Sequence, residues 1–118
     1  MGTRDEGTPI LSAMAGEPQF RERLEAFVIA LGERVDQLQD LEGTHAWKEL
    51  QADARRLAEE AQALGFEPLR EASVAVEQAS AVAQEQGSSR PDAAVREALL
   101  ALTDVARRVR LGHRGSMP

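Results

Sequence analysis

Few side chains in this chain of 118 residues could perform catalysis. The sequence contains two histidines, His45 and His113, and neither cysteine nor tyrosine. Nucleophilic catalysis needs a hydroxyl or thiol beside an oriented base. His45 is expected in the solvated first turn of a helix and His113 near the frayed end of the last one, so neither is placed to act as that base. We therefore do not expect an enzyme.

Metal, cofactor and nucleotide sites are not expected either. The two histidines share no helix face, and the Glu-x-x-His pattern of metal sites in helical bundles is absent. Paired acid–base chemistry needs two carboxyl groups that converge in a cleft, and nothing in the spacing of the acidic residues requires this. The acidic residues considered, all expected to be solvated, are Asp40, Glu42, Glu59, Glu60 and Glu67. No glycine cluster suggests a phosphate-binding loop.

The formal net charge of -6 argues against nucleic-acid binding, because that activity needs a basic surface. Basic residues do gather near the C-terminus, where they suit the carbonyl end of a helix dipole. These residues are Arg107, Arg108, Arg110, His113 and Arg114.

Composition and the N-terminal sequence indicate the class of protein and its location. Aromatic residues make up only 3% of a chain rich in Ala, Leu, Glu, Gln and Arg, which favours helices over strands. The absence of cysteine fits a reducing compartment. The stretch from Met1 to Pro9 lacks the apolar run of a signal peptide or membrane anchor. We expect a cytoplasmic protein that does not associate with membranes.

Apolar residues at spacings of three and four predict the first long helix from Pro18 to about Leu41. Gly32 lies inside this helix at a cost of roughly 1 kcal/mol relative to Ala, which suggests a close helix contact there. Gly43 and Thr44 mark the break, with Thr44 expected as the N-cap of the next helix. The predicted buried stripe is Phe20, Leu24, Phe27, Val28, Leu31, Val35 and Leu38.

The second helix is predicted from about His45 to Leu64. Gly65 is expected to end it in the left-handed conformation, and Pro68 suits the first turn of the following helix. Such a short connection predicts an antiparallel helical hairpin. The predicted buried stripe is Trp47, Leu50, Ala54, Leu57, Ala61 and Leu64.

Two further helices complete the pattern, one from Pro68 to about Gln84 and one from Pro91 to Gly112, which is expected to end it. Residues 86–90 are expected to form the loop between them. The third helix is predicted to bury Leu69, Ala72, Val76, Ala79 and Val82. The fourth is predicted to bury Val95, Ala98, Leu99, Leu102, Val105, Ala106 and Val109.

Four amphipathic helices with short connections predict an all-α fold, an antiparallel four-helix bundle in one domain at residues 9–112. A short accessory helix is expected from Pro9 to Ala15, with Ile10, Leu11 and Met14 as its contacts. Residues 1–8 are expected to be a disordered lead-in and residues 113–118 a flexible tail.

One face of the second predicted helix carries charged and polar residues opposite the apolar stripe, and we call it the candidate face. Residues 54–61 read Ala-Arg-Arg-Leu-Ala-Glu-Glu-Ala and are followed by Leu-Gly-Phe at 64–66. This run resembles the active-site helix of bacterial histidine-containing phosphotransfer (Hpt) domains, whose pattern is roughly Ala-His-x-Leu-Lys-Gly. The candidate face consists of Arg55, Arg56, Ala58, Glu59 and Gln62.

The resemblance implies a fold that has lost its chemistry. Arg55 stands where the family carries the phospho-accepting histidine, Ala58 where it carries a lysine, and Glu59 where a glycine lets the partner approach. A guanidinium stays protonated and offers no free lone pair, so Arg55 cannot accept a phosphoryl group.

The resemblance implies that the candidate face binds a receiver domain or a histidine kinase of a two-component phosphorelay, as adaptor, decoy or regulator. Arg55 would face the acidic pocket of a receiver, where Glu59 would be partly repelled. The alternative is a helical protein-interaction or self-association module unrelated to phosphorelay, with a solvated candidate face. We expect a monomer or a weak homodimer.

Overall fold

The computed structural model describes residues 8–115, and those residues contain helices and no strand. A short 3-10 helix, η2 (Pro18–Phe20), leads directly into the first α-helix. The α-helices are α1 (Arg21–Gly43), α2 (Trp47–Ala63), α3 (Glu67–Glu85) and α4 (Ala93–Gly115). The all-α prediction is confirmed.

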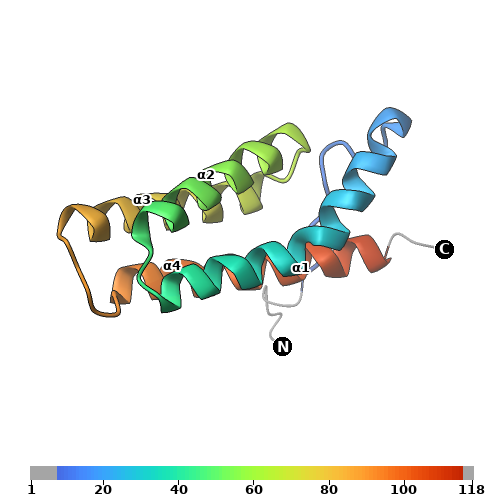
Figure 1. Cartoon of the computed structure of the whole chain (residues 1–118). Coiled ribbons are helices and arrows are strands. Elements are labelled where there is room, and N and C mark those ends of the chain that lie inside the picture. Colours follow the sequence, from blue (N-terminus) through green and yellow to red (C-terminus); the bar gives the residue numbers. More distant parts are fainter. Residues whose placement is uncertain (1–7, 116–118) are drawn as a thin grey trace.

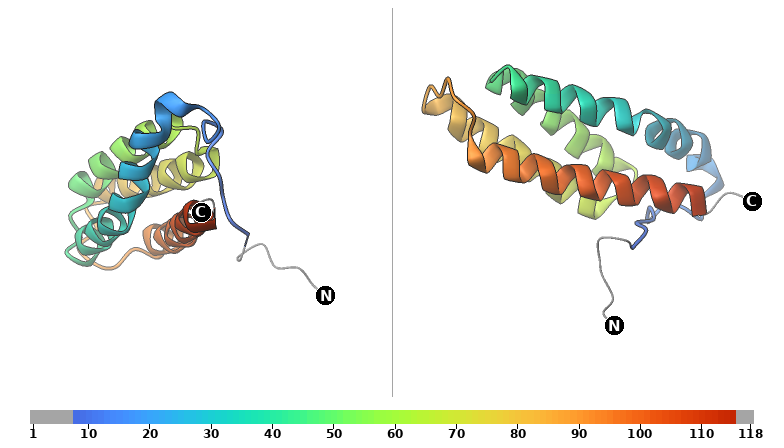
Figure 2. Two further views of the ribbon diagram at one scale, coloured as in Figure 1. Left: turned by 90° about the vertical axis from the view of Figure 1, so that its right-hand side faces the viewer. Right: turned by 90° about the horizontal axis from the view of Figure 1, so that it is seen from below.

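The four helices form the predicted antiparallel bundle. In Figure 1, α1 and α4 lie together in the lower layer, and α2 and α3 lie together in the upper layer. Each helix contacts its neighbours in sequence, and α4 closes the ring by packing on α1 (Figure 2). The contact between α2 and α3 is the most extensive, whereas α1 and α2 pack together least.

The cores of α1 and α2 follow the predicted stripes. All six predicted α2 positions are at most 5% exposed. In α1 the stripe is buried from Phe27 to Leu38, and its N-terminal end, Phe20 of η2 and Leu24, is partly buried against the core. Phe27 stacks on Phe66 with ring centroids 5.7 Å apart, which links α1 to the start of α3.

The predicted core of α3 is only partly right. Val82 is 50% exposed, so its assignment to the buried stripe is wrong, and Ala72 and Ala79 are half-buried. Ser73 and Ser80 are fully buried instead. Each serine hydroxyl donates to the carbonyl four residues earlier, at 2.8 and 2.7 Å, which satisfies the hydroxyl inside the core. An apolar pattern cannot identify such positions.

The connection between α1 and α2 differs from the prediction. Thr44 is the C-cap of α1 and not the N-cap of α2, and its amide donates to the Asp40 carbonyl at 3.1 Å. His45 lies in the connection with a left-handed φ of 57°, where it is half-buried and stacks on Trp47. The expectation of a solvated helical histidine is therefore wrong. The Trp47 indole donates to the Ser88 carbonyl at 2.7 Å, which ties α2 to the α3–α4 loop.

The connection between α2 and α3 agrees with the prediction. Gly65 has a positive φ of 79°, and the following amide, of Phe66, donates to the Ala61 carbonyl at 2.8 Å. This pattern satisfies carbonyls at the end of α2 and turns the chain within a few residues. The exposed pair Glu67 and Arg70 then marks the first turn of α3. The hydrogen bond from Arg70 lowers the pKa of Glu67 and raises that of Arg70.

The N-terminal segment does not form the predicted helix from Pro9 to Ala15. Its described residues 8–16 run along the bundle instead, and we call them the strap. Residues 13–16 form a turn, and the only helical turn before α1 in the described chain is η2. The Ile10 amide donates to the Arg108 carbonyl at 3.0 Å, and the Ala13 amide donates to the Gly65 carbonyl at 2.9 Å. These long-range hydrogen bonds take the amides that a local helix would have used.

Gly112 does not end the last helix, because α4 continues to Gly115. Gly112 is buried where the strap crosses α4, and a Cβ there would overlap the carbonyl oxygen of Ile10. This glycine therefore permits a close backbone approach within a helix. The predicted tail from residue 113 is thus helical as far as residue 115, and residues 1–7 of the predicted lead-in and 116–118 of the tail lie outside the described residues.

Within the described part of the chain, no helix has the length and apolar character that crossing a membrane requires.

Candidate functional site

The structure places four of the five candidate-face residues on the outside of α2. The side chains of Arg55, Arg56 and Glu59 are 68%, 63% and 65% exposed, and Gln62 is also exposed. Their positions lie opposite the stripe that packs into the bundle, as helical periodicity requires. These four residues form a continuous polar surface along the second half of the helix.

Ala58 does not belong to this surface. It is 5% exposed and lies in the buried part of α2, so its assignment to the exposed candidate face is wrong. The reason is helical geometry, since Ala58 follows Ala54 by four residues and precedes Ala61 by three, and both of these alanines are buried. A lysine at this position would have to enter the interface between helices.

The charges of the candidate face are paired locally. Arg55 Nε lies 3.4 Å from Glu59 Oε2, one turn further along α2. Arg56 pairs with Asp53 one turn earlier in the helix. An exposed pair such as Arg55–Glu59 contributes only about 0.3–0.5 kcal/mol, so a binding partner could displace it at small cost.

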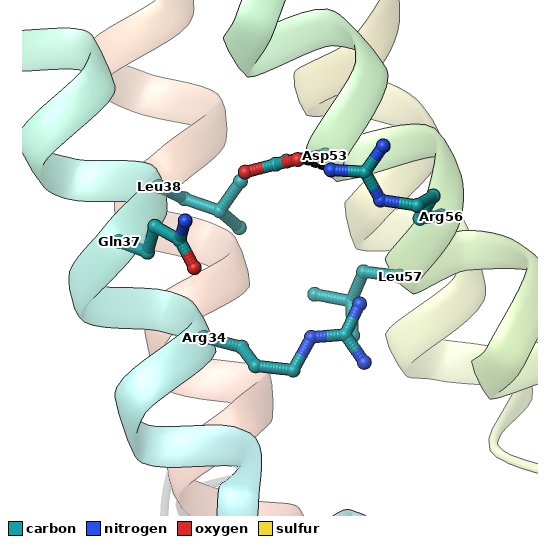
Figure 3. Close-up of a pocket in the computed structure, with 6 residues that line it drawn as sticks. All are labelled: Arg34, Gln37, Leu38, Asp53, Arg56 and Leu57. Carbon is teal, nitrogen blue, oxygen red and sulfur yellow. Dashed lines mark ion pairs between the residues drawn. The ribbon is translucent and has the colours of Figure 1, made fainter.

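A groove runs between α1 and α2 beside the candidate face, and we call it the α1–α2 groove. Its narrower part, about 130 Å³, is shown in Figure 3, with α1 and α2 contributing three side chains each. These side chains are Arg34, Gln37, Leu38, Asp53, Arg56 and Leu57. In Figure 3 the Asp53–Arg56 pair lies on one side of the space and Arg34 lies on the opposite side.

The wider part of the α1–α2 groove has a volume of about 600 Å³ and an apolar floor. Its apolar lining consists of the buried Phe27 and Leu64, the latter being the C-cap of α2, and the exposed alanines Ala26, Ala30 and Ala63. The groove reflects the sparse packing between these two helices. Small side chains leave such space open because they do not fill the gap between helices.

Charged residues border this wider part. Arg34 donates to Glu60 at 2.7 Å and so bridges α1 and α2 across the groove. Arg56 and Glu59 of the candidate face line the same space, whereas Arg55 and Gln62 do not. The sequence did not predict the groove, although the alanines at positions 26, 30 and 63 were a signal for it.

The candidate face presents charged and polar side chains, and the part of the chain that the structure describes holds no cluster for metal chemistry. Within residues 8–115, no group of three or more His, Asp or Glu side chains is arranged to hold a metal ion. His45 lies before the first residue of α2, whereas the candidate face lies on the second half of α2. His45 is therefore not part of the candidate face. The arrangement can therefore form charge-assisted hydrogen bonds with a partner through its guanidinium groups.

Comparisons with known proteins return nothing for this chain: no family model, no curated protein and no solved structure matches it.

Proposed function

We propose that this chain is a non-phosphorylatable, Hpt-like binding module. Its partner in this proposal is a receiver domain or a histidine kinase of a two-component phosphorelay, which it serves as adaptor, decoy or regulator. The observation that supports the proposal best is the exposure of Arg55 and Arg56 on one face of α2, beside the α1–α2 groove. Two guanidinium groups occupy a surface where the resemblance would place an imidazole.

The charge of these groups suggests how binding would work. The acidic pocket of a receiver offers carboxylates, and a guanidinium forms two parallel hydrogen bonds with a carboxylate or a phosphoryl oxygen pair. Arg55 would have to leave Glu59, which the long separation of 3.4 Å and the exposure of both groups make inexpensive. The burial of Ala58 is consistent with a face that binds without holding a phosphoryl group for transfer.

Binding is tested by titrating the protein with purified receiver domains in a calorimeter. We expect Arg55→Glu to weaken binding by at least about tenfold, because it replaces an interfacial cation with an anion. The matched control is Arg96→Glu on α4, where the arginine is 62% exposed and the charge change is identical. If Arg55→Glu and the unchanged protein bound the receiver domain with equal affinity, binding through the Arg55 guanidinium would be ruled out.

Phosphotransfer is tested separately with a phosphorylated receiver and with a small phosphoramidate donor. We expect no acid-labile phosphoryl group on this protein, because Arg55 has no lone pair available to accept it. Label that is present in the unchanged protein and lost in His45→Gln would contradict the proposal. It would identify the stacked His45 as an acceptor.

A further inference from the structure

The outer surface of α1 presents the most exposed large apolar side chain of the described residues, Ile29 at 73% exposure. Ala26 lies three residues before Ile29, and Ala30 follows it directly. Both alanines are exposed, and both line the wider part of the α1–α2 groove. Apolar surface thus continues from Ile29 over two small residues to the groove floor. In Figure 1 this N-terminal half of α1, drawn in light blue, projects at the right-hand end of the bundle.

Acidic residues surround Ile29 at helical spacing. Glu25 and Glu33 lie one turn before and one turn after it, and Glu22 lies one turn before Ala26. All three are exposed, and none of their carboxylates forms an ion pair or hydrogen bond with another described side chain. We call Glu22, Glu25, Ala26, Ile29, Ala30 and Glu33 the Ile29 surface.

The basic residues along the groove are engaged within the molecule. Arg34 bridges to Glu60 at 2.7 Å, and Arg56 pairs with Asp53. The guanidinium of Arg23 lies 5.6 Å from the ring centroid of Phe20. The charged side chains nearest to Ile29 along its own face of α1 are therefore the acidic ones, Glu22, Glu25 and Glu33, whereas Arg21 and Arg23 lie to either side of that face.

We propose that the Ile29 surface and the adjoining groove bind an amphipathic helix of a partner protein whose apolar stripe is flanked by lysines and arginines. Apolar residues at spacings of three and four would cover Ile29 and enter the groove between Ala30 and Ala63. The flanking cations would face Glu22, Glu25 and Glu33. The Ile29 surface lies on α1 and does not include Arg55, although the adjoining groove is also lined by Arg56 and Glu59 of the candidate face.

A second copy of the chain fits this surface poorly. Packing two Ile29 surfaces together would bring the unpaired Glu22, Glu25 and Glu33 of one copy against those of the other. Like charges that face each other across an interface oppose association. The charge pattern thus favours a basic partner over self-association.

The test uses a labelled peptide of about 18 residues with leucine on one helical face and lysine on the other, measured by fluorescence anisotropy. We expect saturable binding that Ile29→Ser and Glu33→Lys each weaken by at least about fivefold. The matched controls lie on α4, and they are Leu100→Ser, where the leucine is 65% exposed, and Glu97→Lys. Both controls should keep the original affinity.

Three results would overturn the proposal. One is absence of binding to the unchanged protein, and another is an equal loss of affinity in the Leu100 and Ile29 variants. The third is a concentration-dependent dimer that Ile29→Ser abolishes in sedimentation, since the occupant would then be a second copy. Arg55→Glu should leave peptide affinity unchanged, so this proposal and the proposed function can fail independently.

Discussion

Gly32 lies in the middle of α1, and the far end of the Arg110 side chain lies against it in place of the expected close approach of another helix. A Cβ at this position would lie 3.3 Å from Nη1 of Arg110. The neighbour is the far end of a flexible side chain, which can move by a few tenths of an ångström. The contact therefore does not require glycine.

We predict that Gly32→Ala stabilises the protein by about 0.5–1 kcal/mol, because alanine favours the helix and the unfolded chain loses conformational freedom. Urea unfolding followed by circular dichroism measures the change. If Gly32→Ala instead lowered the stability, the Arg110 side chain would be unable to move away from the added methyl group. Arg110→Ala in the same background would then restore the gain.

Residue by residue, the sequence identified the exposed members of the candidate face correctly but not Ala58. Arg55, Arg56 and Glu59 are polar at positions opposite the apolar stripe, which suffices to predict their exposure. Alanine is small and common on both surfaces and interiors, so its residue type does not decide between them. The packing of α2 into the bundle decides that Ala58 is buried.

At the scale of elements, the strap and α4 form a contact that only a glycine allows. Gly112 lies directly beneath the Ile10 carbonyl, and the Ile10 amide donates to Arg108 in the preceding turn of α4. The obstacle to a larger residue is backbone, which cannot move aside without releasing the strap. The strap is thus fixed to the bundle by main-chain contacts.

We predict that Gly112→Ala destabilises the protein by about 1–3 kcal/mol, as overpacking does, even though alanine is the better helix former. Hydrogen exchange at the amides of Ile10 and Ala13 should become faster because the strap detaches. Gly32→Ala serves as the control, since the same substitution there has the opposite predicted sign. Unchanged exchange at Ile10 would show that the strap tolerates the added methyl.

The bundle as a whole depends on a single core that all four helices share. Leu57 is 1% exposed and belongs to this core, whereas Leu100 on α4 is 65% exposed. We predict that Leu57→Ala lowers the free energy of unfolding by about 2–5 kcal/mol. Leu100→Ala should change it by less than about 0.5 kcal/mol. Thermal or urea unfolding monitored at 222 nm compares the two variants, and equal effects would contradict the assigned core.

The sequence by itself determined the four helices, the turn at Gly65 and the buried faces of α1, α2 and α4. In α4, five of the seven predicted stripe residues are at most 4% exposed, and the other two, Ala98 and Val105, are partly buried. These features depend on local periodicity and on backbone preferences, which neighbouring residues carry. Tertiary structure decided the burial of Ala58, Ser73 and Ser80, because small and weakly polar side chains are placed by what packs against them. It also decided the strap over Gly112 and the opening between α1 and α2. Both arise from contacts between segments far apart in the chain, and no local pattern specifies which distant segments meet.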